Sequence, residues 1–198
     1  MPSVLIAARH LVDRLRQPRS RAEELRQLRQ RLQETPTSLP PAERAAALRL
    51  RALRERLSEL VGPVESCRTC AKGHPAPHGH FDGGHCCGLR TEDAFNDDEV
   101  AALRLAGTTP GRLIPPAGGP DHAGCAFRGP TGCSLAVPDR PNLCLRYLCP
   151  DLTRELYRRD PERLAVIDAV NAELEAEYLA FIKLRADRLE DEALGIAS

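Results

Sequence analysis

Apolar side chains recur every three or four residues through most of the first sixty positions. Ser20 stands where a hydroxyl would cap the second of these apolar runs. Pro18 and the proline-rich stretch 35–41 interrupt the pattern, so we expect three helices within residues 3–60, the last ending at Gly62. The stripes consist of Leu5, Ala8, Val12 and Leu15, then Leu25, Leu28 and Leu32, then Ala46, Leu50, Leu53, Leu57 and Leu60.

The helical period returns in the last fifty residues. Asp151 is placed to cap a short helix, and Asp160 precedes Pro161, which is suited to the first position of a long one. Three glutamates of this helix are spaced two apart, so they cannot share one face as a carboxylate metal site requires, and we expect them to be solvated. The apolar stripe is Leu164, Ile167, Leu174, Tyr178, Phe181 and Ile182, and the glutamates are Glu173, Glu175 and Glu177.

The central part of the chain carries only short periodic runs. Asn96 and the three acids after it predict a helix through Ala106, with Gly107 just past its end. Residues 125–127 and 133–137 are short apolar runs joined by the turn Arg128-Gly129-Pro130-Thr131-Gly132, which predicts a small β-hairpin. A short turn or helix carrying Cys144 is expected after Arg140-Pro141.

These patterns predict a mainly α protein. Helical N- and C-terminal regions would frame an irregular, cysteine-rich domain that contains the small β-hairpin. We expect the boundaries to fall at residues 1–62 for the arginine-rich helical region, 63–150 for the cysteine-rich domain, and 151–198 for C-terminal helices that pack on the rest.

All eight cysteines fall between Cys67 and Cys149, a stretch that also holds nearly all the glycines and few large apolar side chains. Too little apolar surface is present there for a core of ordinary size, so something else must organise the segment. The Cys67-x-x-Cys70 spacing lets two thiolates reach one tetrahedral ion from a single turn. Metal binding contributes on the order of 10 kcal/mol to folding, enough to replace a missing core.

The adjacent cysteines 86 and 87 favour two metals over one, because neighbouring side chains diverge. Eight thiolates divide into two four-ligand sites, whose negative charge cationic neighbours would offset. Disulfides and buried apolar cysteines are the alternatives, and a solvent-exposed histidine-rich loop is an alternative for residues 71–85. The metal ligands predicted are Cys67, Cys70, Cys86, Cys87, Cys125, Cys133, Cys144 and Cys149, with His85 as a possible ninth; the cations are Arg68, Lys72, Arg128, Arg140 and Arg146.

Charge is balanced overall but unevenly distributed. Residues 1–60 hold thirteen arginines against seven acids, whereas residues 151–198 hold seven bases against twelve acids. The simplest explanation is that the two ends pack together or present opposite faces. The third helix has arginines around most of its circumference, as in an RNA-binding helix, but no aromatic side chains interleave them. A solvated face is therefore favoured over a nucleic-acid surface.

No targeting segment and no apolar run long enough to span a membrane is apparent. A cytoplasmic location is therefore expected, with cysteines kept reduced and available as metal ligands. Neither a serine nucleophile elbow nor a glycine-rich phosphate loop is present, so the sequence assigns no catalytic residue.

The cysteine pattern resembles a known family. Cys67-x-x-Cys70, Cys86-Cys87, Cys125, Cys133, Arg140-Pro141-x-x-Cys144 and Cys149 stand in the order of the CxxCxxCC family of zinc- or iron-chelating proteins (YkgJ-like), over roughly residues 65–150. In that family the pair of adjacent cysteines follows CxxC closely, whereas here residues 71–85 are inserted. The resemblance implies zinc or iron. One branch of the family is similar to flagellin lysine methylases and implies an iron–sulfur cluster, but no residues of a methylase site carry over.

The sequence thus predicts a cytoplasmic metal-binding protein in which zinc or iron organises the central domain. Two alternatives remain open. One is an iron–sulfur protein with redox, sensing or methyl-transfer-related activity, favoured by all-cysteine ligation. The other is a nucleic-acid-binding protein that uses the arginine-rich helices.

Overall fold

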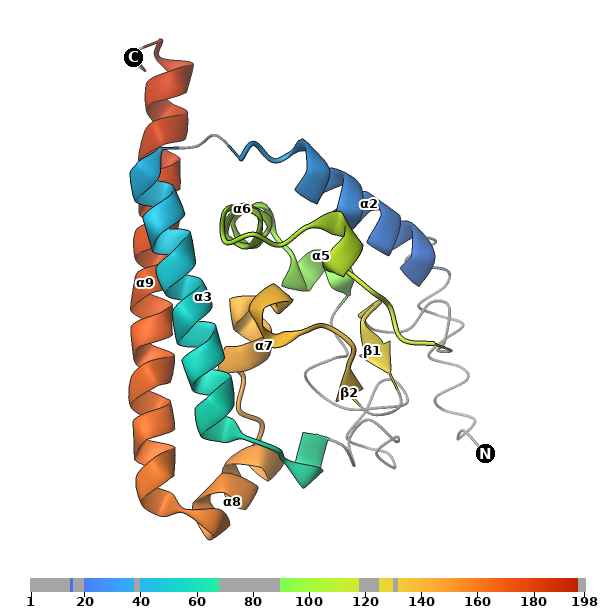
Figure 1. Ribbon diagram of the computed structural model, residues 1–198, viewed down its shortest axis with the longest axis vertical. Coiled ribbons are helices and arrows are strands. Elements are labelled where there is room, and N and C mark those ends of the chain that lie inside the picture. The colour runs from blue at the N-terminus through green and yellow to red at the C-terminus, as the bar shows by residue number, and fades with distance from the viewer. Residues whose placement is uncertain are drawn as a thin grey trace.

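The protein is mainly helical in a computed structural model that describes residues 15, 20–37, 40–67, 90–117, 125–129 and 132–195. This confirms the predicted fold class of a mainly α chain with a small antiparallel hairpin (Figure 1). The elements are α2 (Arg21–Glu34), α3 (Pro41–Val61), α5 (Thr91–Ala94), α6 (Asp97–Leu105), the 3-10 turn η2 (Pro110–Arg112), β1 (Arg128–Gly129), β2 (Gly132–Cys133), the 3-10 turn η3 (Val137–Asp139), α7 (Asn142–Arg146), α8 (Pro150–Arg159) and α9 (Pro161–Ala193).

The helix starts follow the predicted caps in three of four cases. Ser20 accepts a hydrogen bond from the Glu23 amide and forms a capping box at the start of α2, Asn96 caps α6, and Asp160 caps α9. The exception is α8, which begins two residues earlier than expected. Its cap is the Cys149 thiol rather than Asp151, because Pro150 takes the first helical position. The first of the three predicted N-terminal helices lies outside the described residues except for Leu15, which is helical but 78% exposed.

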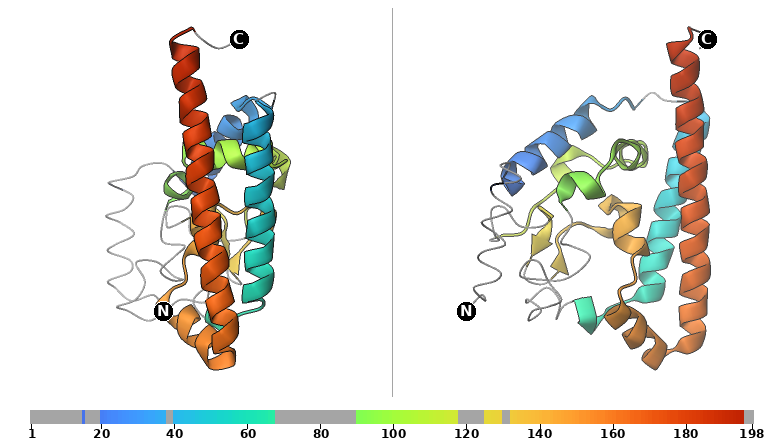
Figure 2. Two further views of the ribbon diagram at one scale, coloured as in Figure 1. Left: turned by 90° about the vertical axis from the view of Figure 1, so that its left-hand side faces the viewer. Right: turned by 180° about the vertical axis from the view of Figure 1, so that it is seen from behind.

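Helices α3 and α9 run antiparallel, side by side, along the long axis of the molecule (Figures 1 and 2). Their predicted stripes meet in an apolar cluster to which α6 and α8 also contribute. Leu50, Ile167, Leu174 and Phe181 are fully buried at its centre. This cluster joins residues from the N-terminal, central and C-terminal regions of the sequence.

Arginine–glutamate pairs flank the α3–α9 interface. Arg49 lies 2.7 Å from Glu177, and Arg56 lies 3.4 Å from Glu173. The oppositely charged ends of the chain therefore pack together, as the uneven charge distribution predicted. As expected, Glu173 and Glu175 are more than half exposed, whereas Glu177 is about one-fifth exposed. Each of the three also forms an ion pair, Glu175 with Arg146 of α7.

A second apolar cluster joins α2 to the central segment. Leu25, Leu28 and Leu32 pack against side chains from α5, α6 and residues 113–135. The rings of Phe95 and Phe127 are 5.6 Å apart between centroids at its centre. The sequence-based expectation of a segment with no core therefore needs correction for its described part, because α2 supplies the missing apolar surface.

The predicted hairpin exists but is shorter and differently placed. Arg128 pairs with Cys133 and Gly129 with Gly132, so each strand has two residues. β1 occupies positions assigned to the turn, while Val137 begins a 3-10 turn instead of ending a strand. In the described part of the chain, no helix is long and apolar enough to cross a bilayer.

Candidate metal centre

Five of the eight predicted cysteine ligands belong to the described residues, and each sits at or near the end of an element. Cys67 is the last described residue of a helical segment that begins at Glu65, Cys125 precedes β1, and Cys133 belongs to β2. Cys144 is the third residue of α7, and Cys149 caps α8. The remaining predicted ligands, Cys70, Cys86, Cys87 and His85, and the other histidines of the central segment lie outside the described residues.

The segments that carry these cysteines lie on the α8 side of α6 along the long axis, in all views of the molecule (Figures 1 and 2). Cys125 and Cys133 pack against the α2 cluster, whereas Cys149 packs against the α3–α9 cluster. No disulfide joins two of the five described cysteines. Among described residues no three His, Cys, Asp or Glu side chains gather as a metal-binding group, so a complete site needs ligands from outside them.

Buried arginines surround the backbone around Cys125. Arg21, Arg90 and Arg128 are each less than a tenth exposed. Arg21 donates from Nη2 to the carbonyl oxygens of Cys125 and, at 3.0 Å, of Arg128. Arg90 pairs with the buried Glu24. Buried arginines therefore lie beside the backbone that carries Cys125, a placement that suits neighbouring thiolates.

Thr91 of α5 links this region to α2 through hydrogen bonds. Thr91 donates its amide to Glu24 at 3.3 Å, and its hydroxyl accepts the Ala126 amide at 2.9 Å. Of the cations predicted beside the cysteines, Arg128 is buried here, directly across the hairpin from Cys133. The burial of Arg21 and Arg90 could not be predicted, because helical periodicity does not indicate which arginines become buried.

Arg140 and Arg146, also predicted to offset thiolate charge, have other partners in the described structure. Arg140 donates from Nε to the Leu135 carbonyl at 2.9 Å. Arg146 lies 2.6 Å from Glu175 and donates to Asn171 of α9. Their contacts fix the η3–α7 connection and the packing of α7 on α9.

A buried charged group holds the start of the helix that carries Cys144. Glu99 accepts the Asn142 amide at 2.9 Å and the Asn142 side-chain Nδ2 at 3.3 Å. Burial raises the pKa of Glu99 to about 7, against the lowering effects of the Arg54 charge and of the hydrogen bonds from Asn142 and Leu143. Arg54 has no exposed surface, and burial lowers its pKa.

α8 fixes the turn before Cys67. The Glu155 carboxylate accepts the amides of Glu65 at 3.0 Å and Ser66 at 2.8 Å. Burial pushes the pKa of Glu155 upward, but the hydrogen bonds from Ser66 and Glu65 and the Arg159 charge outweigh it and hold the pKa below its usual value. At its other end α8 begins at Cys149, whose Sγ accepts the Leu152 amide at 3.5 Å. One helix therefore positions two of the predicted ligands.

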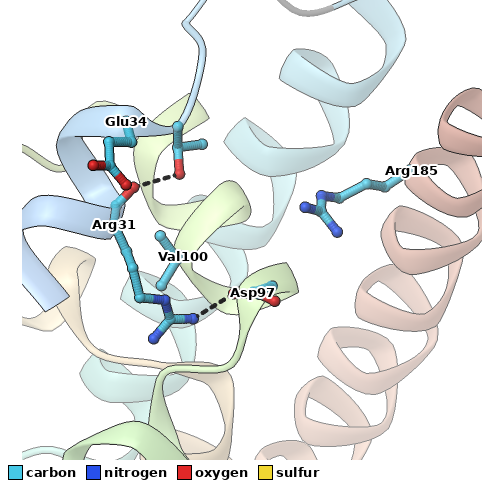
Figure 3. Close-up of a pocket in the computed structure, with 6 residues that line it drawn as sticks. Arg31, Glu34, Asp97, Val100 and Arg185 are labelled. Atoms are coloured by element: carbon cyan, nitrogen blue, oxygen red, sulfur yellow. Dashed lines mark hydrogen bonds and ion pairs between the residues drawn. The ribbon is translucent and has the colours of Figure 1, made fainter. Parts of the chain in front are cut away.

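A polar cleft lies between the end of α2, α6 and α9, away from the described cysteines (Figure 3). Arg31 reaches Asp97 at 2.6 Å, and Arg185 reaches Asp98 at 2.7 Å. Both guanidinium groups are already paired with carboxylates, and the lining holds neither cysteine nor histidine. The cleft therefore has neither the soft ligands nor the unbalanced charge of a metal or anion site.

Comparison of the chain with protein-family models, with curated proteins and with solved structures found no match, so the candidate site rests on its own residues and their contacts.

Proposed function

We propose that this chain is a metal-binding protein whose cysteines hold two neighbouring zinc or iron ions, or an iron–sulfur cluster. The observation that carries the proposal is the pairing of reduced cysteines with buried positive charge. Arg21 donates to the carbonyl oxygens of Cys125 and Arg128, Arg128 lies across the hairpin from Cys133, and both arginines are less than a tenth exposed. A site of four thiolates around a divalent ion carries a formal charge of about minus two, which such a surrounding would stabilise.

The described cysteines would supply five ligands and Cys70, Cys86 and Cys87 the rest. The five lie on four separate parts of the fold, so a metal bound by them would tie together the turn at Cys67, the hairpin, α7 and α8. Metal ions of this kind supply folding free energy and, in an iron–sulfur cluster, electron transfer. The pattern of cysteines and the resemblance to zinc- or iron-chelating proteins favour the same function, in a cytoplasmic setting where thiols stay reduced.

The function as a nucleic-acid-binding protein has less support. Arg49 and Arg56 are engaged by glutamates of α9, Arg51 pairs with Glu55 and donates to the Ala106 carbonyl, and Arg54 is buried. Four arginines of the helix that suggested a basic surface therefore already have partners within the molecule.

Elemental analysis and an absorption spectrum of anaerobically purified, full-length protein test the proposal. We expect about two zinc ions per chain in a colourless protein, or iron with acid-labile sulfide in a brown one. The Cys144→Ser variant should hold less metal, whereas Tyr147→Phe, in the same segment, should hold the wild-type amount. Protein that carries neither zinc nor iron, and takes up neither after anaerobic reconstitution, would show that the proposal is wrong.

A further inference from the structure

We propose that Glu99 and Arg54 are positioning residues that hold the helix carrying Cys144 in place and thereby set the affinity of the metal centre. The inference rests on the proposed function, in which Cys144 is a ligand. Neither side chain contacts the metal-binding sulfur atoms in this scheme. They act on the backbone to which Cys144 belongs.

Helix α7 has no side-chain cap at its N-terminus. Its N-cap is Pro141, which offers no side-chain acceptor, and the helix is only five residues long. Unpaired amides in the first turn of a helix cost stability unless another group accepts them. Glu99 provides that acceptor from α6, because its carboxylate binds the amides of Asn142 and Leu143 and the Asn142 side chain.

Arg54 holds the residue on the other side of Pro141. It donates from Nη1 to the Arg140 carbonyl at 3.1 Å, and the Arg140 side chain is fixed in turn by its bond to the Leu135 carbonyl. Arg54 of α3 and Glu99 of α6 therefore both hydrogen-bond to the Arg140–Pro141–Asn142 turn. Cys144 follows directly, since its own amide donates to the Pro141 carbonyl at 3.0 Å.

The burial of Glu99 and Arg54 is energetically unfavourable, which indicates that these residues have a role beyond stabilising the fold. Glu99 is 2% exposed and Arg54 has no exposed surface, yet no ion pair within 4 Å joins them in the described structure. The Nε and Nη2 atoms of Arg54 have no hydrogen-bond partner among the described residues. Two buried charges without a direct contact stabilise a fold less well than apolar residues of similar size would. Apolar residues, however, could not form hydrogen bonds to the backbone of Arg140 and Asn142, the two positions that fix α7.

Groups that orient metal ligands from behind typically change metal affinity by about 10- to 100-fold when removed. The test is a cobalt(II) titration of anaerobic, metal-free, full-length protein, followed through the thiolate-to-cobalt absorption bands. We expect Glu99→Ala to weaken cobalt binding at least about tenfold, while Glu99→Gln, which keeps an oxygen for the Asn142 amide, stays within about threefold of wild type. Glu99→Asp keeps the charge but retracts it by one methylene, and should fall between them.

The matched control is Glu43→Ala. Glu43 is as buried as Glu99 and pairs with Arg188 at the opposite end of α3, so its loss should destabilise the protein without changing cobalt affinity. The rate of amide hydrogen exchange at residues 142–146 is a second measurement. This rate should rise in Glu99→Ala and remain low in Glu99→Gln and Glu43→Ala.

The outcomes separate this inference from the proposed function. If wild-type protein binds no cobalt through its thiolates, the proposed function is wrong and the inference falls with it. If wild type binds cobalt and all three Glu99 variants bind it equally well, the inference alone is overturned. Should Glu99→Ala fail to fold, the contrast between Glu99→Asp and Glu99→Gln decides, and equal affinities would again contradict the positioning role.

Discussion

The Glu99 carboxyl group can accept a proton without leaving its place. Its neighbour Asn142 presents Nδ2 to one carboxylate oxygen, while Asn142 Oδ1 has no hydrogen-bond partner among the described residues. Because the amide group of asparagine can turn over, Oδ1 is available to accept a proton carried by neutral Glu99. The positive charge of Arg54 on α3 opposes protonation of Glu99. Burial and the Glu99 charge raise the pKa of Tyr178 on α9, whose hydroxyl contacts Asn96.

Stability should therefore depend on pH through Glu99. Its pKa is raised from an ordinary 4.5 to about 7 in the folded protein, so between these values the folded state binds the extra proton. This contribution to stability is fully present below pH 4.5 and is lost as the pH rises through 7. Comparing wild type with Glu99→Gln removes the effects of other groups. Relative to Glu99→Gln, we expect the wild-type free energy of unfolding to fall by about 3 kcal/mol from pH 4 to pH 8.

Urea denaturation of both proteins at several pH values measures this difference. Glu43→Gln serves as the control, because Glu43 is equally buried but is paired with Arg188 at 2.5 Å. A wild-type minus Glu99→Gln difference that is constant from pH 4 to pH 8 would contradict the raised pKa.

At the scale of single elements, the turn before Cys67 depends on a carboxylate from another helix. Glu155 of α8 accepts the amides of Glu65 and Ser66, which would otherwise begin a helical turn without a cap. Glu155→Ala should destabilise the protein by about 1 kcal/mol, the usual effect of losing a helix cap, and speed hydrogen exchange of those two amides. Glu190→Ala, an exposed change on α9, should do neither. Unaltered exchange at residues 65 and 66 would show that α8 does not hold the turn.

The α3–α9 pair is held by its apolar face. Leu174 is fully buried between the two helices, whereas Leu179 on the same helix is 60% exposed. Leu174→Ala should lower the free energy of unfolding by about 3 kcal/mol because it leaves a cavity, and Leu179→Ala should change it by less than about 0.5 kcal/mol. Both variants make the same chemical change on one helix, so equal losses in thermal or urea denaturation would contradict the assigned burial.

The elements that sequence alone predicted well are those whose signals are local. The period of Leu25, Leu28 and Leu32 behind the Ser20 cap needs no distant partner to be recognised, and the same is true of α6 and α9. The hairpin was misplaced because strands of two residues carry no alternation to read. Buried charges such as Arg54 and Glu99 could not be predicted, since an arginine or glutamate becomes an interior group only through partners far away in the chain.

For the whole molecule, the two apolar clusters change what the metal is expected to support. The α3–α9 cluster holds Cys149 only at its edge, and α6 is buried between both clusters. A metal centre would therefore hold the cysteine-bearing segments onto a helical framework that is already stabilised by apolar contacts. This departs from the sequence-based expectation that metal binding replaces a missing core in the central segment.

Chelation under anaerobic, reducing conditions should thus loosen the protein unevenly. We expect amide exchange in residues 125–149 to accelerate after metal removal, because only Ala126, Phe127 and Leu135 are buried apolar side chains among the described residues there. Exchange in α6 and in residues 164–181 of α9 should stay slow, since their protection comes from the buried clusters. Hydrogen exchange followed by mass spectrometry measures this contrast, with chelator presaturated with zinc as the control. Equal acceleration in α9 would mean that the metals support the entire fold, and no change in residues 125–149 would mean that they support none of it.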